Sequence, residues 1–336
     1  MPLKDFLLPT ATRRSQRAHR PQGRLIVATT LREFVKPLAQ VVPDGAGRGR
    51  SAVRDFIRYT EQRGGRVVGT ASIVAAGSNA TKPLFVAAAV ILPGETATIL
   101  MSSDLPATAS PRRDASDAVD AAVGLVRGTG VKLAQILLPS EALDLRSMLT
   151  TNNGFAHVAD LGYLHKHVDR KPKPRPLPEG VTLVGYTEKT RPLFRQALED
   201  SYQGSLDCTA LNGVRSMDAV LDGHEASGVP IRDGWQVAVV KDEQGQNRPV
   251  GVMLLAGLGR DGRDGVELVY LGISPEFRGK SLSDAMLDRA DVRAAGTRQR
   301  SLALAVDTTN EPGLRLYQRR QSVEIARRTA MFKVFS

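Results

Sequence analysis

The chain of 336 residues contains very little cysteine: Cys208 is its single thiol. One thiol excludes a disulfide within the chain and a zinc site built from cysteines. Aromatic residues are also scarce, at 5%. Hydrophobic residues nevertheless make up 42% of the chain, so globular folding is expected. The length is sufficient for two compact cores.

Long apolar segments are missing as well. The longest, Leu84–Leu92, is too short to span a bilayer, and we interpret it as a buried strand. No apolar signal-peptide core stands near the N-terminus. Together with the single cysteine, these absences lead us to expect a cytoplasmic protein without a membrane association.

The net charge of +11 is concentrated in two segments. Residues 1–24 hold six basic residues against Asp5, and residues 169–178 hold four against Asp169. We interpret both segments as solvated and flexible. Nucleic acid is therefore not the favoured partner, and it would have to bind through these two segments. A transit peptide is a weaker interpretation of the basic N-terminus.

The Pro- and Lys-rich segment 169–178 cannot form a helix or a central strand, and we interpret it as a linker. It divides the chain into a first half, 23–168, and a second half, 179–336, after a flexible tail at 1–22. The two halves repeat the same order of elements, which indicates a duplicated domain. The predicted fold class is α/β (α+β), with a mixed, mostly antiparallel sheet flanked by helices in each half.

Periodicity predicts the individual elements. In the second half we expect helices over 188–202, 216–226, 282–295 and 311–320, and strands over 181–186, 235–240, 249–258, 266–273, 301–306 and 324–335. In the first half we expect helices over 50–63, 115–127 and 140–150, and strands over 24–29, 65–75, 83–92, 95–102, 133–138 and 156–167.

The segment from Val266 to Ser283 carries the most chemistry. A predicted strand ends at Ile273, and the residues from Arg278 to Ser283 then open a helix. Small residues let the backbone approach phosphate oxygens, and amides at a helix start attract anions. Arg278 and Lys280 add positive charge. The alternative is a tight strand–helix turn that binds nothing.

A second motif follows further along the chain, from Asn310 to Tyr317. The pair of motifs resembles the GNAT family of N-acetyltransferases, whose pyrophosphate loop reads R/Q-x-x-G-x-G/A and whose later helix reads N-x-x-A-x-x-L-Y. The resemblance covers the last hundred residues well and the second half in element order.

This resemblance implies roles for particular residues. Backbone groups near Leu271 and Ile273 would bind the pantetheine arm of acetyl-CoA like an added strand. Asn310 would contact the pantetheine or cap the next helix, and Tyr317 would protonate the departing thiolate. The backbone amides that would hold the pyrophosphate belong to Arg278, Gly279, Lys280, Ser281, Leu282 and Ser283.

The sequence departs from the family pattern at two places. Ser281 and Ser283 stand where the family has glycine, and serine disfavours a positive φ, so the loop is expected to be shifted or its affinity weakened. Gln321 and Ser322 replace the Gly-Phe that usually ends the tyrosine helix, so an altered helix end is expected.

A base is needed because only a neutral amine attacks a thioester. Glu267 resembles the glutamate that serves as base in the histone-acetyltransferase branch of the family. Strand alternation predicts that its side chain shares a face with Val269, Leu271 and Ile273, and its alternative role is that of a solvent-exposed residue at a strand end.

Other residues carry weaker signals. In this family the region of the second half that contains Tyr202, Asp207 and Arg215 shapes the acceptor pocket, and Asp207 would attract a cationic amine. Cys208 has no visible base and is expected to be an idle thiol. The patterns also place Trp235 in the core and His224 at a solvated helix end, and they give no metal site at the pair His165 and His167.

The first half lacks these motifs. Its equivalent strand is followed by Asp104 and two prolines, and no residue matches Glu267 or Tyr317. We therefore interpret it as a degenerate copy that kept the fold and lost the cofactor site.

The leading hypothesis is thus an acetyl-CoA-dependent transfer of acetyl to a primary amine of a small molecule or peptide, by direct attack and without a metal. The alternative is a catalytically silent acyl-CoA-binding sensor or scaffold. The sequence specifies neither the acceptor nor the oligomeric state.

Overall fold

The computed structural model describes residues 20–42, 50–77, 82–259 and 261–335. The expected basic tail at 1–22 lies outside the described residues except for its last three positions. Among the helices of the described ranges, none has the length and apolar character needed to cross a bilayer.

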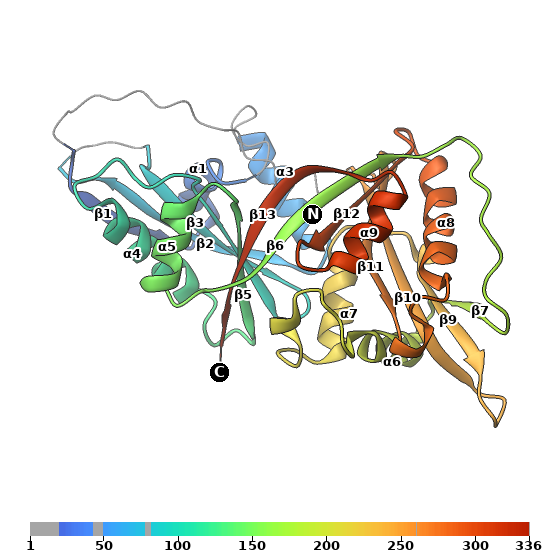
Figure 1. The fold of residues 1–336 in the computed structure, drawn as a ribbon. Coiled ribbons are helices and arrows are strands. Elements are labelled where there is room, and N and C mark those ends of the chain that lie inside the picture. The colour runs from blue at the N-terminus through green and yellow to red at the C-terminus, as the bar shows by residue number, and fades with distance from the viewer. Residues whose placement is uncertain (1–19, 43–49, 78–81, 260, 336) are drawn as a thin grey trace. The chain divides into compact units, whose positions relative to one another are not determined.

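The described chain forms two compact units (Figure 1). The N-terminal unit contains the residues up to Ala159 together with those from Arg328 onward, and the C-terminal unit runs from Asp160 to Arg327. Strands β6 (Ala156–His167) and β13 (Val323–Val334) therefore each pass from one unit into the other. The expected linker, 169–178, lies within the C-terminal unit and contains neither helix nor strand.

In the N-terminal unit, β4 pairs with β5 in parallel and the other pairings are antiparallel. Helices α4 and α5 share one apolar core with β2 to β5, and β13 contributes Met331 to this core. The strands follow the order β1 (Gly23–Ala28), β2 (Arg66–Ala75), β3 (Phe85–Leu92), β4 (Thr96–Met101), β5 (Leu133–Pro139) and the end of β13. The helices are α1 (Leu31–Leu38), α3 (Arg50–Glu61), α4 (Pro111–Gly124) and α5 (Leu143–Thr151).

The C-terminal unit repeats this plan, with β11 and β12 as its parallel pair. Its strands follow the order β6, β12 (Ser301–Asp307), β11 (Gly265–Ile273), β10 (Asn247–Leu258), β9 (Gln236–Lys241) and β7 (Thr182–Gly185), with β8 (Val229–Pro230) beside β10. Its helices are α6 (Arg191–Tyr202), α7 (Met217–Ala226), α8 (Leu282–Ala295) and α9 (Glu311–Arg319).

Helices cover the two faces of this second sheet differently. On one face, α8 packs Leu282, Met286 and Ala290 against β10, β11 and β12. On the other face, α6 and α7 pack around the fully buried Trp235, whose indole Nε1 donates to the carbonyl of Leu255 at 2.8 Å. The expectation that Trp235 belongs to the core is thus confirmed.

The predicted fold class is confirmed, because both units are mixed, mostly antiparallel sheets with flanking helices. Most element bounds differ from the predicted ones by one to three residues, and two differences are larger. Helix α1, which contains Pro37, was not predicted, and α4 begins at Pro111, four residues before the expected start. Proline is tolerated in the first turn of a helix, where its missing N–H has no partner to lose.

Part of the basic charge is paired with carboxylates of α8, by the exposed Arg175, the half-buried Arg320 and the buried Lys166. Arg175, in the expected linker, donates through Nε to Asp288 of α8 at 2.7 Å. Arg320 bonds both Asp288 and Asp291 at 2.7 Å, and Lys166 bonds Asp291 at the same distance. This network ties the segment before β7 and the end of α9 to α8.

Candidate active site

The parallel strands β11 and β12 separate along their length. They pair only over Val266–Leu268 and Leu302–Leu304, although β11 continues to Ile273 and β12 to Asp307. Beyond Leu268, the edge of β11 toward β12 has no strand partner among the described residues. Backbone groups of this edge near Leu271 are therefore available to an extended ligand, whereas the carbonyl of Ile273, further along, accepts a hydrogen bond from Arg278 Nε.

The loop that follows β11 presents a run of backbone donors. Within the described residues, the amides of the six consecutive residues 279–284 have no hydrogen-bond partner, and the next amide, of Ala285, donates to Ser281. A Cβ at Gly279 would meet nothing within 4 Å, so the approach to this backbone is open. Successive free amides at the start of a helix suit a pyrophosphate.

One serine and one glutamine have a backbone conformation that is typical of glycine. Ser281 has φ +59° and Gln321 has φ +62°, in the left-handed region that non-glycine residues rarely adopt. These residues stand where the resemblance led us to expect glycine. Both side chains differ from the family pattern, but the backbone adopts the left-handed conformation that glycine would, so each position carries local strain.

Arg278 does not extend freely into the loop. Its guanidinium donates to the carbonyls of Ser201, Gln203 and Gly204 at the end of α6, and to that of Ile273. The side chain of Lys280 lies over the ring of Phe277. Arg278 thus fastens the loop after β11 to α6, while its main chain leads into the six free amides.

Tyr317 and Asn310 lie on α9. The side chain of Asn310 accepts the amide of Gly313 at 3.1 Å and caps this helix. Tyr317 packs against the α8 core, where burial, and then the charge of Asp207, raises the pKa of its phenol. A raised pKa keeps the phenol protonated, as a proton donor to a thiolate requires.

Glu267 lies on a different face from the one that simple alternation predicts. Val269 is an extra residue in β11, since Leu254 pairs with Tyr270 and Leu255 pairs with Leu268. Val266 and Leu268 face α8, so the intervening Glu267 faces the opposite side, where Val269 and Tyr270 contact the α6–α7 core. Leu271 and Ile273 face α8 again. The prediction that these four residues share a face is wrong, because the bulge shifts the alternation.

The predicted acceptor residues gather near the separated ends of β11 and β12. The amide of Asp307 donates to Asp207 at 3.0 Å, which holds the loop after α6 against the end of β12. Burial raises the pKa of Tyr202 to about 12, with the charge of Arg215 opposing this shift and that of Asp207 adding to it. The rings of Tyr202 and Tyr270 are in edge contact at 5.8 Å.

His224 lies in another environment than the sequence analysis predicted. Its ring lies 5.3 Å from that of Tyr270, so the prediction of a solvated helix end is wrong. Burial, and then Arg215, lowers the pKa of His224 to about 4, which keeps the imidazole neutral at pH 7. Histidine alone at a helix end gives no sign of this, because its ring contact with Tyr270 joins two elements that are far apart in sequence.

Asp207, Cys208 and Asp307 bring three potential metal-ligand atoms within 4.8 Å of one another. Their chemistry does not favour a cation. Asp307 accepts the amides of Cys208 and Thr309, and Asp207 accepts that of Asp307. Burial, followed by the two carboxylates, raises the pKa of Cys208 to about 12, so the thiol stays protonated.

The N-terminal unit repeats the strand separation without the loop. Its strands β4 and β5 pair over Thr96–Thr98 and Leu133–Gln135 and then diverge. Helix α4 starts at Pro111, which has no amide hydrogen, and carries Asp114 in its first turn. A missing donor and a carboxylate make this helix start unsuited to a phosphate.

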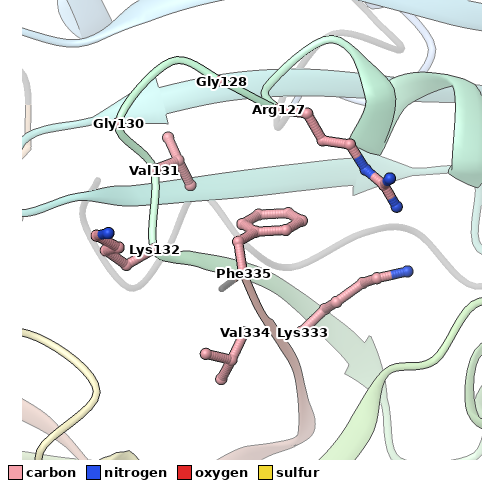
Figure 2. A pocket seen from close by; sticks show the side chains of 8 residues that line it. All are labelled: Arg127, Gly128, Gly130, Val131, Lys132, Lys333, Val334 and Phe335. Atoms are coloured by element: carbon pink, nitrogen blue, oxygen red, sulfur yellow. The ribbon is translucent and has the colours of Figure 1, made fainter.

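The N-terminal unit has a pocket at another place, the start of β5. Its volume is about 430 Å³. Figure 2 shows Phe335 at its centre, with the charged ends of Arg127 and Lys333 extending to the same side of the ring. The ammonium of Lys333 also donates to the carbonyl of Asn153 at 2.6 Å. This pocket lies at the opposite end of β5 from its separation from β4, so it does not correspond to the loop of the C-terminal unit.

Comparisons with known proteins agree with this geometry. A model of the acetyltransferase (GNAT) family matches residues 216–321. The fold is similar to that of a GCN5-related N-acetyltransferase from Sphaerobacter thermophilus, with a TM-score of 0.58 and 14% identity over 92% of this chain and 95% of the other. It is also similar to a tandem GNAT protein from the clavulanic acid biosynthesis pathway, with a TM-score of 0.52 and 13% identity over 93% of this chain and 98% of the other.

None of the curated proteins compared with the chain matches its sequence. The structural likenesses establish the fold, and the family model covers α7, the separated strands, the amide loop and the helix of Tyr317. Residues 216–321 therefore match the acetyltransferase (GNAT) family, and the fold of the chain is similar to that of GNAT proteins.

Proposed function

We propose that the C-terminal unit transfers an acetyl group from acetyl-CoA to the nitrogen of a primary amine. The observation that carries this proposal is the run of six free amides at residues 279–284, placed directly after the strand edge that separates from β12. Acetyl-CoA offers a pyrophosphate for the amides and a pantetheine arm with peptide-like groups for the edge. The residues present fit both parts of this molecule.

The side chains divide the chemistry between them. Glu267 accepts a proton from the amine, which then attacks the thioester carbon. A C–N bond forms and the C–S bond breaks, the phenol of Tyr317 gives its proton to the sulfur, and the proton that the new amide nitrogen then loses restores the phenol. Tyr202, Asp207 and Arg215 bind the acceptor, a small molecule or a peptide. The reaction takes place without a metal, and we expect it in the cytoplasm.

Proline at position 283 tests the amide loop. Ser283 is the second residue of α8, and Pro192 and Pro312 occupy the same position in α6 and α9. Ser283→Pro therefore removes one donor from a position where proline is compatible with a helix. We expect the Kd of acetyl-CoA, measured by calorimetry, to rise on the order of tenfold or more, the value of one hydrogen bond to a charged group. Ser283→Ala keeps the donor and is the matched control.

Turnover is measured by the release of free thiol from acetyl-CoA over a panel of primary amines. Tight binding with turnover of at least one amine supports the enzyme. Tight binding without turnover across the panel would favour the acyl-CoA sensor instead. Equal acetyl-CoA affinities of the Ser283→Pro and Ser283→Ala variants would show that the amide loop does not bind the pyrophosphate.

A further inference from the structure

One histidine of β6 lies in a cross-strand row with Glu267. In the paired strands, His165 is opposite Ala303 of β12, and Ala303 is opposite Glu267 of β11. Directly paired residues of adjacent strands point to the same face of a sheet. The row continues to Ala256 of β10, so an alanine lies on each side of Glu267.

The neighbours of His165 confirm the face to which it points. Leu164 packs in the α8 core and Lys166 bonds Asp291 of α8, so both flanking residues face α8. His165 therefore faces the other side, as Tyr163 does, which packs with Ala303. Glu267 occupies this side because of the bulge at Val269. Both side chains are half-buried.

Distance and space permit an interaction between the two side chains. Two strand spacings separate them, which places their Cα atoms roughly 10 Å apart. Only the short side chain of Ala303, which is buried beside Tyr163 and Leu258, stands between them in this row, so the longer carboxylate and imidazole side chains can reach each other directly or through one water. Ala305, the next residue of β12 on this face, is exposed, which opens the same region to solvent.

Few other titratable groups face this region from the packed strands. Strand β6 adds Tyr163 and the exposed His167, and β13, on the other side of β6, adds Glu324, which is paired with Arg327. Strand β12 adds Asp307, whose carboxylate already binds the amides of Cys208 and Thr309. Strand β10 adds Ala256 and Leu258, and β8 adds Val229 and Pro230. Further along β11 lies Tyr270, and Arg215 acts electrostatically on His224 beside it.

We propose that His165 is a positioning and proton-relay residue for Glu267 in the C-terminal unit. This role rests on the proposed acetyl transfer. Glu267 takes the proton from the amine, the carboxylic acid passes it to the imidazole of His165, and the imidazolium releases it to water, which restores the carboxylate. No other bond changes. Strand β6, which begins in the N-terminal unit, thereby supplies a functional side chain to the C-terminal unit.

The experiment replaces His165 by glutamine in the full-length chain, with His167→Gln as the matched control two residues along the same face. We expect His165→Gln to lower kcat about tenfold, a modest part of what general acid–base catalysis contributes. The slope of kcat between about pH 5.5 and 7.5, the range in which histidine titrates, should also disappear. The KM for acetyl-CoA should stay unchanged in His165→Gln. The control His167→Gln should keep the pH profile of kcat that the wild type has. An unaltered pH profile of His165→Gln would overturn the relay.

A measurement without turnover separates this inference from the proposed function. NMR titration of the histidine ring signals gives the pKa of His165 in the wild-type protein and in Glu267→Gln. A neighbouring carboxylate raises a histidine pKa, so the substitution should lower the pKa of His165 by about one unit or more. No change would refute the pairing even in an active enzyme. A drop in a protein that turns over no amine would support the pairing and refute the acetyl transfer.

Discussion

Asp207 and Asp307 bind each other's backbone segment: the amide of Asp307 donates to Asp207 Oδ1 at 3.0 Å, and Asp307 Oδ2 accepts the amide of Cys208 at 3.2 Å. This exchange fastens the loop after α6 to the end of β12, next to the α9 helix that carries Tyr317. Residues one hundred positions apart in the sequence thus shape one side of the candidate active site.

Substitutions at Asp207 separate its hydrogen bond from its charge. Asp207→Asn keeps an oxygen that can accept the Asp307 amide, whereas Asp207→Ala leaves that amide without a partner. We expect Asp207→Ala to lower the free energy of unfolding by about 1–2 kcal/mol and Asp207→Asn by clearly less. Urea denaturation measures both values. Equal losses would show that the charge, and not the hydrogen bond, holds the loop.

Tyr317→Phe tests the proton donor. Removal of the hydroxyl should lower kcat roughly 100-fold, the lower range for general acid catalysis, with the Kd of acetyl-CoA nearly unchanged. The measurement combines thiol release with calorimetry. Tyr186→Phe is the control, since its hydroxyl accepts a hydrogen bond from Arg191 away from the loop. Full turnover by Tyr317→Phe would remove this residue from the mechanism.

The left-handed residues Ser281 and Gln321 should gain stability as glycine. Each position has a positive φ that glycine adopts without a steric cost, so Ser281→Gly and Gln321→Gly should each stabilise the fold by about 0.5–1 kcal/mol. Ser283→Gly, in the first turn of α8, is the control and should not stabilise. Thermal unfolding measures the three variants. If Ser281→Gly lowered the stability as much as Ser283→Gly does, the backbone strain inferred at Ser281 would be wrong.

His224 should make stability depend on pH. Its folded pKa is about 4 and its ordinary value 6.5, so below pH 6.5 the unfolded chain binds a proton that the native state does not. Stability therefore falls as the pH drops from 6.5 to 4, by at most about 3 kcal/mol. Denaturation at a series of pH values should show this slope in the wild type and a flatter one in His224→Gln. The same slope in both proteins would assign it to other groups.

Met331 and Met253 distinguish the two units. Met331 belongs to β13 but packs in the core of the N-terminal unit, whereas Met253 packs in that of the C-terminal unit. Each replacement by alanine should cost about 2–5 kcal/mol. In hydrogen-exchange measurements, the amides of β2–β5 should lose protection in Met331→Ala, and those of β9–β12 should lose it in Met253→Ala. Loss of protection in β9–β12 alone for Met331→Ala would contradict the division of β13.

Local patterns of the sequence were sufficient to predict most of the secondary structure. Helix α8 and strand β6 have the predicted bounds, because apolar spacing and helix-start residues act within a few positions of the chain. The amide loop was also predictable, since it needs only a strand end, small residues and a helix start. The resemblance to the GNAT family came from these same short motifs.

Other features depend on contacts between distant residues. The face of Glu267 was predicted wrongly because a single bulge at Val269, opposite β10, reverses the alternation. The contacts of Arg278 with α6 and of His224 with Tyr270 require helices that are far from β11 in sequence.

The sequence by itself determined the elements, the two-fold repetition and the motifs of the loop and of α9, because these arise from interactions along a short stretch of chain. Only the tertiary structure decided which strands complete each unit, on which side Glu267 lies and which histidine shares its row. Sheet register and burial bring together residues more than one hundred positions apart, and no local pattern encodes that proximity.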